Sequence, residues 1–212
     1  MAETAILDFW EADVAATDAS IVLPDGCRDL IYCIPASGKP YWFLSKLDLT
    51  ARQVQFRDSR RLHGVRLKPG TILTDNLSVE NLNQDRIELD RGIQRIGNSA
   101  LIESSVEESL TALRQERTVG EAANALGLSI RTLQRKVTSQ TGQAPRFWNR
   151  LSRVRRAARH LIAHQHILSC VLECGYADQP HLNREFKTWF GVSPRTFLLD
   201  NERCSRILDS GY

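Results

Sequence analysis

Leu133-Gln134-Arg135, followed by Gly142 and then Pro145-Arg146, returns 49 positions later as Leu182-Asn183-Arg184, followed by Gly191 and then Pro194-Arg195. Each copy comes after a short apolar segment that ends at a glycine, Gly127 in the first copy and Gly175 in the second. A short helix, a tight turn and a second helix with outward polar side chains make up a helix-turn-helix unit. The sequence therefore predicts two such units in tandem.

The first unit carries helix-capping signals. Thr118 and Glu121 have the spacing of a capping box, which predicts that a helix starts there and ends at Gly127. Ser129 is the expected N-cap of a second helix over residues 130–140. The spacing assigns to the core-facing stripe of that helix Ile130, Leu133 and Val137. Its outward positions are Arg131, Thr132, Gln134, Arg135 and Thr138.

The second unit has the same plan. Pro180 is tolerated only in a first helical turn, so a helix starts near it with Asp178 or Gln179 as the cap. The packed residues expected in the preceding helix are Ile167, Leu168, Val171 and Leu172. The residues expected to pack from the second helix are Leu182, Phe186 and Trp189 or Phe190. Those expected to point outward are Gln179, His181, Asn183, Arg184 and Lys187. Ser193-Pro194 predicts a short closing helix.

A single amphipathic helix is predicted between the two units, over residues 145–164. Twenty residues at 1.5 Å each span roughly 30 Å, and neighbouring major-groove openings on one face of DNA repeat at about 34 Å. No acidic residue lies between Glu121 and Glu173. One-signed charge of this kind is typical of a polyanion binder, although a solvated helix face is the alternative. The basic side chains expected to contact phosphates are Lys136, Arg146, Arg150, Arg153, Arg155, Arg156, Lys187 and Arg195.

Charge and secondary-structure signals both divide the chain near residue 100. Residues 1–100 carry 12 basic and 14 acidic side chains (net −2), and residues 101–212 carry 16 and 11 (net +5). The first half reads as extended, and the strand segments expected there are 21–23, 30–34, 41–44, 54–56 and 65–67. Short helices and loops are expected over 72–100, a linker at Gly97-Asn98-Ser99, and then a helical face made of Leu101, Val106, Leu110 and Leu113.

These signals predict an α+β chain: a small antiparallel β-rich domain over 1–100, an all-α domain over 101–200 with two helix-turn-helix units joined by a long helix, and a tail over 201–212.

Residues of about 104–199 resemble the DNA-binding domain of the AraC/XylS family of bacterial transcription regulators. The residues that carry the resemblance run from Gly175 to Lys187, followed by Phe190-Gly191-Val192-Ser193-Pro194. The resemblance implies a seven-helix domain that binds an asymmetric promoter site, with RNA polymerase as a further partner. It places the base contacts at Arg131, Thr132, Gln134, Arg135, Gln179, Pro180, His181, Asn183 and Arg184, of which Pro180 has no side-chain donor.

The N-terminal half is similar, more weakly, to the sensor region of a subset of these regulators. The residues concerned are Leu23 to Ile31 and His63 to Gly70. An aromatic-lined effector pocket is the functional interpretation, and sheet core is the alternative for the aromatic residues. The pocket candidates are Trp10, Asp25, Cys27, Tyr32, Tyr41, Trp42 and His63. Pairing with a second copy of the chain is a further role open to this half.

Other functional classes find less support. No phosphate loop, nucleophile elbow or zinc-hydrolase helix is present, so we expect no catalysis and no cofactor. His160, His164 and His166 lie close together without enough neighbouring ligands for zinc, so no metal is expected. Cys170 and Cys174 are expected to be core thiols. Five cysteines, no apolar run of about 20 residues and no signal-like start at Met1-Ala2-Glu3-Thr4 predict a cytoplasmic protein without a membrane partner.

Two rival functions remain open at this point. One is an effector-binding protein whose helical half recruits a protein partner, which footprinting would separate from a DNA reader. The other is a repair transferase fused to a DNA-binding module, which metal analysis and an alkyl-transfer assay would expose.

Overall fold

The computed structural model describes residues 5–74 and 77–212, which form two compact units. The first unit comprises the residues up to Ser20, Cys27–Leu47 and Val54–Glu107. The second comprises Ile21–Gly26, Asp48–Gln53 and Glu108–Tyr212. The expectation about a signal-like start rests on residues 1–4, which lie outside the described residues. Among the described helices, none has both the length and the apolar character required to cross a bilayer.

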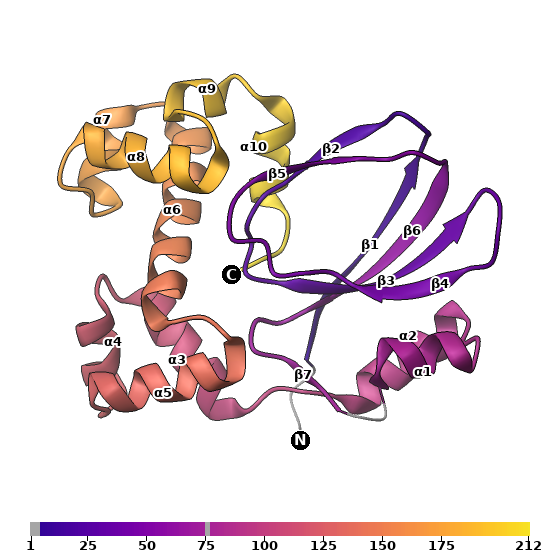
Figure 1. The fold of residues 1–212 in the computed structure, drawn as a ribbon. Coiled ribbons are helices and arrows are strands. Elements are labelled where there is room, and N and C mark those ends of the chain that lie inside the picture. Colours follow the sequence, from indigo (N-terminus) through magenta and orange to yellow (C-terminus); the bar gives the residue numbers. More distant parts are fainter. Residues whose placement is uncertain (1–4, 75–76) are drawn as a thin grey trace. The chain divides into compact units, whose positions relative to one another are not determined.

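A four-stranded antiparallel sheet forms the centre of the first unit (Figure 1). Its strands, in spatial order, are β1 (Ile6–Val14), β6 (Arg60–Leu67), β3 (Arg28–Pro35) and β4 (Tyr41–Leu44). The expected strands are present. Strand β1 lies at the edge of this sheet. It was not expected, because acidic residues interrupt its apolar pattern.

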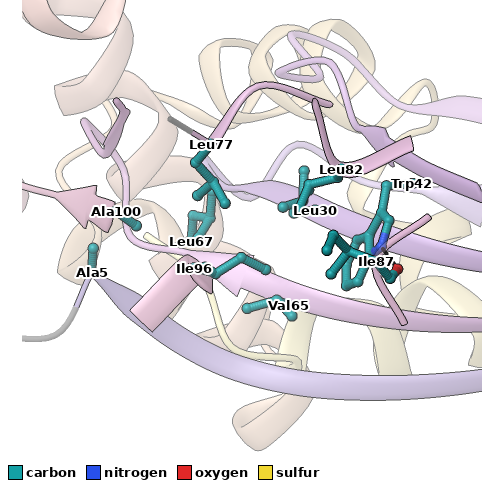
Figure 2. Close-up of a cluster of buried hydrophobic side chains, with 10 residues drawn as sticks. All are labelled: Ala5, Leu30, Trp42, Val65, Leu67, Leu77, Leu82, Ile87, Ile96 and Ala100. Carbon is teal, nitrogen blue, oxygen red and sulfur yellow. Dashed lines mark hydrogen bonds between the residues drawn. The ribbon is translucent and has the colours of Figure 1, made fainter. Parts of the chain in front are cut away.

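Two helices, α1 (Val79–Gln84) and α2 (Leu89–Ser99), supply the apolar side chains that pack on one face of this sheet. Figure 2 shows the buried cluster, in which Trp42 of β4 lies beside Ile87. The Trp42 indole N–H donates to the Ile87 carbonyl at 2.8 Å. Gly92 of α2 lies against the same ring, and a Cβ there would be 2.1 Å from Trp42 Cζ2. The Trp42 ring therefore sets how closely α2 can approach the sheet.

The opposite face carries a smaller cluster. Ile31, Cys33 and Leu62 are buried there, and Trp10 and Phe43 pack against them. The Trp10 indole N–H donates to Asp29 Oδ1 at 3.0 Å, and Arg66 Nε donates to the same oxygen at 2.9 Å. Asp29 thus fastens β1 and β6 to β3.

Two short strand pairs accompany the main sheet. They are β2 (Ala19–Val22) with β5 (Arg52–Gln55), and β7 (Ile72–Leu73) with β8 (Ala100–Leu101). The linker expected at Gly97-Asn98-Ser99 is wrong, because these residues form the last turn of α2. Leu101 was expected on a helical face and instead lies in β8, where it is exposed.

Helices make up most of the second unit. In chain order they are α3 (Ser104–Gln115), α4 (Val119–Ala125), α5 (Ile130–Thr141), α6 (Pro145–His164), α7 (Ile167–Glu173), α8 (Gln179–Phe190), α9 (Pro194–Leu198) and α10 (Asn201–Leu208). The α+β fold class, with a β-rich part followed by a helical domain, is confirmed. The domain bounds at residues 100 and 200 stay a prediction.

The segment Ile21–Gly26 is integral to the helical unit. Tyr212 N donates to the Asp25 carbonyl at 2.7 Å, and the Tyr212 hydroxyl donates to the Leu110 carbonyl of α3 at 2.6 Å. Burial raises the pKa of the Tyr212 phenol far above its usual range, so this hydroxyl remains a donor at any ordinary pH. Gly26 has φ +78°, and a Cβ there would lie 2.8 Å from Tyr212 and 2.9 Å from Trp148.

We expect Gly26→Ala to destabilise the protein by about 2–5 kcal/mol, because a left-handed backbone and a steric clash act together. Gly191→Ala is the matched control, since Gly191 has φ +75° and nothing within 4 Å of the added Cβ. Its cost should be about 1–2 kcal/mol. Denaturant unfolding measures both, and equal losses would show that the packing around Gly26 is not tight.

Candidate nucleic-acid interface

The first helix-turn-helix unit is built from α4 and α5 as the capping signals predicted. Thr118 Oγ accepts from Glu121 N at 3.1 Å, and Glu121 Oε2 accepts from Thr118 N at 3.0 Å, which completes the capping box. Ser129 caps α5 by accepting from Thr132 N at 3.1 Å. Leu133 and Val137 are fully buried, whereas Ile130, expected in the core, is 55% exposed. Ile130 is the first helical residue, and it lies beyond the reach of the core that α5 covers.

The second unit is built from α7 and α8. Asp178 is the cap, and its carboxylate accepts from His181 N at 2.6 Å. Leu182 and Phe186 pack inward, together with both Trp189 and Phe190. The expectation for α7 was wrong for Leu168 and Leu172, which are exposed.

The packed face of α7 consists of Cys170, Val171 and the C-capping Cys174. Both thiols are reduced and buried, as expected of core cysteines. Cys170 Sγ also lies 3.5 Å from the Ala157 carbonyl of α6. Hydrogen bonding to Cys174 and burial raise the pKa of Cys170, so its thiol stays protonated.

Helix α6 joins the two units as one uninterrupted 20-residue helix. In Figure 1 the pair α4–α5 lies by one end of α6 and the pair α7–α8 by the other. Leu151, Val154, Ala158 and Leu161 have no exposed surface. Both pairs therefore share one support of roughly 30 Å.

The base-contact candidates differ in accessibility. Exposed candidates are Arg131, Gln134, Arg135, Gln179, Pro180 and Arg184. Within residues 5–74 and 77–212, Arg135 and Arg184 have no ion-pair partner. Asn183 is half-buried. Thr132 is also half-buried, and its hydroxyl lies 2.8 Å from the Ser129 hydroxyl.

His181 is engaged with its own turn. Its ring lies edge-on to Tyr176, with centroids 5.1 Å apart, and its Nδ1 accepts from Ala177 N at 3.4 Å. These contacts leave Nε2 as the ring atom that is not committed within the turn.

The phosphate-contact candidates fall into three groups. Exposed ones are Arg146, Arg156, Lys187 and Arg195, and Lys136 is half-buried. Arg150 and Arg153 are half-buried and both face Glu185 of α8. Arg155 has no exposed surface, so the prediction that it contacts phosphate was wrong.

Arg155 instead fastens parts of its own unit together. Its Nη1 donates to the Pro24 carbonyl at 3.4 Å, and its Nη2 donates to the carbonyls of Ile207 at 3.3 Å and Asp209 at 3.2 Å. The helical period carried the signal, because residue 155 lies four after Leu151 and three before Ala158, on the packed face. The burial of Glu185 was also not predicted, although this residue lies three after Leu182 and four before Trp189, on the packed face of α8.

Residues 48–53 also complete the helical unit. Ala51 N donates to the Trp189 carbonyl at 2.8 Å, and that carbonyl is in the last turn of α8. Such terminal carbonyls have no partner inside their helix and need one from elsewhere. Nothing in the sequence marked this contact.

The effector-pocket candidates do not gather at one place. Tyr32 and Trp42 share the helix-covered face, with ring centroids 4.9 Å apart, and the Tyr32↔His63 pairing puts His63 on that face too. Trp10 packs on the opposite face, where the Cys33↔Tyr41 pairing also places Tyr41. Asp25 belongs to the other unit, and Cys27 is buried. Because these side chains lie on opposite faces of the sheet, the prediction that the whole set lines one pocket is wrong.

The three histidines are occupied by local contacts. His160 Nε2 lies 2.9 Å from Ser169 Oγ, and His166 Nδ1 accepts from Ser169 N at 3.1 Å as the cap of α7. The rings of His160 and His164 have centroids 4.5 Å apart.

Two helix-turn-helix units packed on one connecting helix define the class of tandem helix-turn-helix domains. The comparisons specify it further. Residues 122–199 match a family model described as a helix-turn-helix domain, in the part of the chain where the sequence resembles the AraC/XylS family.

Transcriptional activators match part of the chain. The HTH-type transcriptional activator RhaS of Citrobacter koseri is 38% identical over 76 residues, which are 34% of this chain and 27% of that protein. RhaS of Klebsiella pneumoniae is 37% identical over 84 residues, 38% of this chain and 30% of that protein. The chain thus matches less than a third of the length of these relatives.

Solved structures of ToxT from Vibrio cholerae align over most of the chain. One of them covers 91% of this chain and 97% of its own, with a TM-score of 0.46 and 11% identity.

We expect Arg155→Met to lower the free energy of unfolding by about 2–4 kcal/mol, because three carbonyl groups lose a charged donor in a buried setting. The neighbouring exposed residue provides the control: Arg156→Met should change stability by no more than about 0.5 kcal/mol. Urea unfolding of both variants decides the matter. A small and equal effect of the two substitutions would contradict the buried role of Arg155.

Proposed function

We propose that this protein is a cytoplasmic, sequence-specific transcription regulator that inserts α5 and α8 into successive major grooves of promoter DNA. The observation that carries the proposal is the placement of Arg135 and Arg184 on the two helices that follow the turns, where both are exposed and neither has an ion-pair partner among the described residues. A guanidinium forks onto O6 and N7 of guanine, and an amide pairs with adenine. Gln134 and Gln179 are exposed on the same two helices and supply amides.

The connecting helix supports binding to one face of the duplex. Its length of roughly 30 Å is close to the 34 Å repeat of the major groove. Arg146 and Arg156 of this helix are exposed and can neutralise phosphates, which adds affinity without sequence preference.

The proposal extends to regulation by the β-rich half. The resemblance of residues 23–31 and 63–70 to a sensor region supports an effector-responsive regulator. Its proposed partners are promoter DNA, RNA polymerase, a small-molecule effector and a second copy of the chain. Because the two aromatic groups lie on opposite faces of the sheet, an effector would use one group and not both.

Arg184→Ala is expected to cost about 1–3 kcal/mol of binding free energy on DNA selected by the protein from a random pool. The loss should be confined to one base pair of the site, because the side chain reads one base. Repeating the selection with the variant measures this relaxed preference. Lys187→Ala is the control and should weaken selected and scrambled duplexes alike. Unchanged affinity and preference in Arg184→Ala would contradict the assignment.

Substituting the exposed connector arginine, as Arg156→Gln, is expected to reduce the salt dependence of binding by about one phosphate contact, or roughly 0.9 in the slope of log K against log salt. Fluorescence anisotropy with a labelled duplex at several salt concentrations measures the slope. Arg155→Gln provides the comparison, since a buried guanidinium releases no counterion from DNA. An identical slope for wild type and Arg156→Gln would remove Arg156 from the interface.

A further inference from the structure

Helix α8 contains one acidic residue, Glu185, and it is buried. It directly follows Arg184, which points outward to solvent. A carboxylate removed from water is costly unless it is paired and hydrogen-bonded. Its partners therefore indicate what the position is for.

Both carboxylate oxygens of Glu185 face arginines of α6. Arg150 approaches Oε1 with Nη2 at 2.5 Å and Nε at 3.2 Å. Arg153 Nη2 lies 3.5 Å from Oε2, and this pair is an ion pair without a hydrogen bond. The two arginines are three residues apart, so they present neighbouring guanidinium groups from one face of α6.

Each of these guanidinium groups also lies over an aromatic ring. The Arg150 guanidinium lies over the Trp189 ring, 5.7 Å from its centroid, and Trp189 packs in turn on Phe147 of α6 with centroids 5.4 Å apart. The Arg153 guanidinium lies 5.3 Å from the centroid of Tyr176, which belongs to the turn between α7 and α8. The network thus connects the connector helix, the turn and the recognition helix.

Hydrogen bonds are directional, so they restrict the rotation and sliding of a packed helix more than apolar contacts do. Leu182 and Phe186 can keep their contacts if α8 rotates or slides by a fraction of a turn, whereas the two N–H donors of Arg150 that converge on Glu185 Oε1 cannot. Buried ionic groups add little net stability, and their best-attested role is to fix register. Arg184 and Gln179 project from the same rigid helix, so their aim depends on that register.

The same pairing also changes the charge that DNA meets. Glu185 offsets part of the charge of Arg150 and Arg153, which belong to a stretch without acidic residues of its own. Unpaired, the two arginines would attract any phosphate backbone and raise non-specific binding.

We propose that Glu185 is a positioning residue for the second recognition helix. Through Arg150 and Arg153 it fixes the rotation and register of α8 on α6, and it keeps both arginines from contributing to non-specific binding. Its effect is to raise the ratio of specific to non-specific DNA affinity. This inference rests on the proposed function.

The test compares full-length wild type and Glu185→Gln on two duplexes, one selected from a random pool by wild type and one scrambled. The shape-conserving substitution is expected to weaken binding to the selected duplex by about tenfold or more. Binding to the scrambled duplex should stay equal or tighten, with a salt slope steeper by up to about 0.9. A residue that only stabilises the fold would not tighten non-specific binding. An unchanged ratio in a folded Glu185→Gln protein would overturn the proposal.

Three further variants sharpen the result. Arg146 is an exposed arginine in the first turn of α6, so Arg146→Gln should weaken binding to both duplexes equally and leave the ratio of the two affinities unchanged. Arg150→Gln should lower the ratio, and the double variant Arg150→Gln/Glu185→Gln should lower it no more than the worse single variant, because both break one contact. Additive losses would contradict the pairing. Glu185→Asp keeps the charge but shortens the side chain, so it should lose specific affinity without gaining non-specific affinity. The same variant tests the proposal if Glu185→Gln fails to fold.

The outcomes for the two proposals are distinct. A wild-type protein that does not discriminate between the duplexes refutes the proposed function, and this inference falls with it. A wild type that discriminates, together with a Glu185→Gln variant that discriminates equally well, refutes only the role of Glu185.

Discussion

Burial of one face of α6 is the constraint on which the helical unit depends. Leu151, Val154, Ala158 and Leu161 are completely enclosed, and the helix pairs at the two ends of α6 pack on this helix. A rod that contributes its apolar stripe to both helix-turn-helix units fixes them relative to itself. Each unit is too small to bury a sufficient core alone, so the rod supplies the missing apolar surface.

The arginines of the helical unit are sorted by their position around their helices. Arg156 lies on the open side of α6, Arg150 and Arg153 lie at the border where α8 packs, and Arg155 lies in the packed stripe. Four arginines within seven residues thus meet three environments. Their shared chemistry makes them look equivalent in a count of charge, but the 3.6-residue period separates them.

Much of this architecture was readable from local chemistry. Thr118, Ser129 and Ser193 act as caps through neighbouring residues, so their motifs predicted the helix starts correctly. Gly142 and Gly191 end α5 and α8 in the left-handed conformation. Ile130, Leu168 and Leu172 were misassigned because periodicity identifies an apolar side of a helix without showing how far the core extends over it. The acidic edge strand β1 and the Ala51 contact escaped prediction because both depend on residues distant in sequence. Of the candidate site, the exposed side chains of α5 and α8 were found by pattern, whereas the buried partners of Glu185 needed coordinates.

The helical unit is discontinuous in the sequence, since Ile21–Gly26 and Asp48–Gln53 belong to it. The first segment accepts hydrogen bonds from Arg155 and Tyr212, and the second closes the end of α8. A gene fragment that begins at the hundredth codon would encode all the candidate DNA-contacting residues, yet it would lack two segments of the helical unit. Exchange of N-terminal halves between two related chains by recombination at that point would separate these segments from the helices they complete, so the two halves are expected to be inherited together.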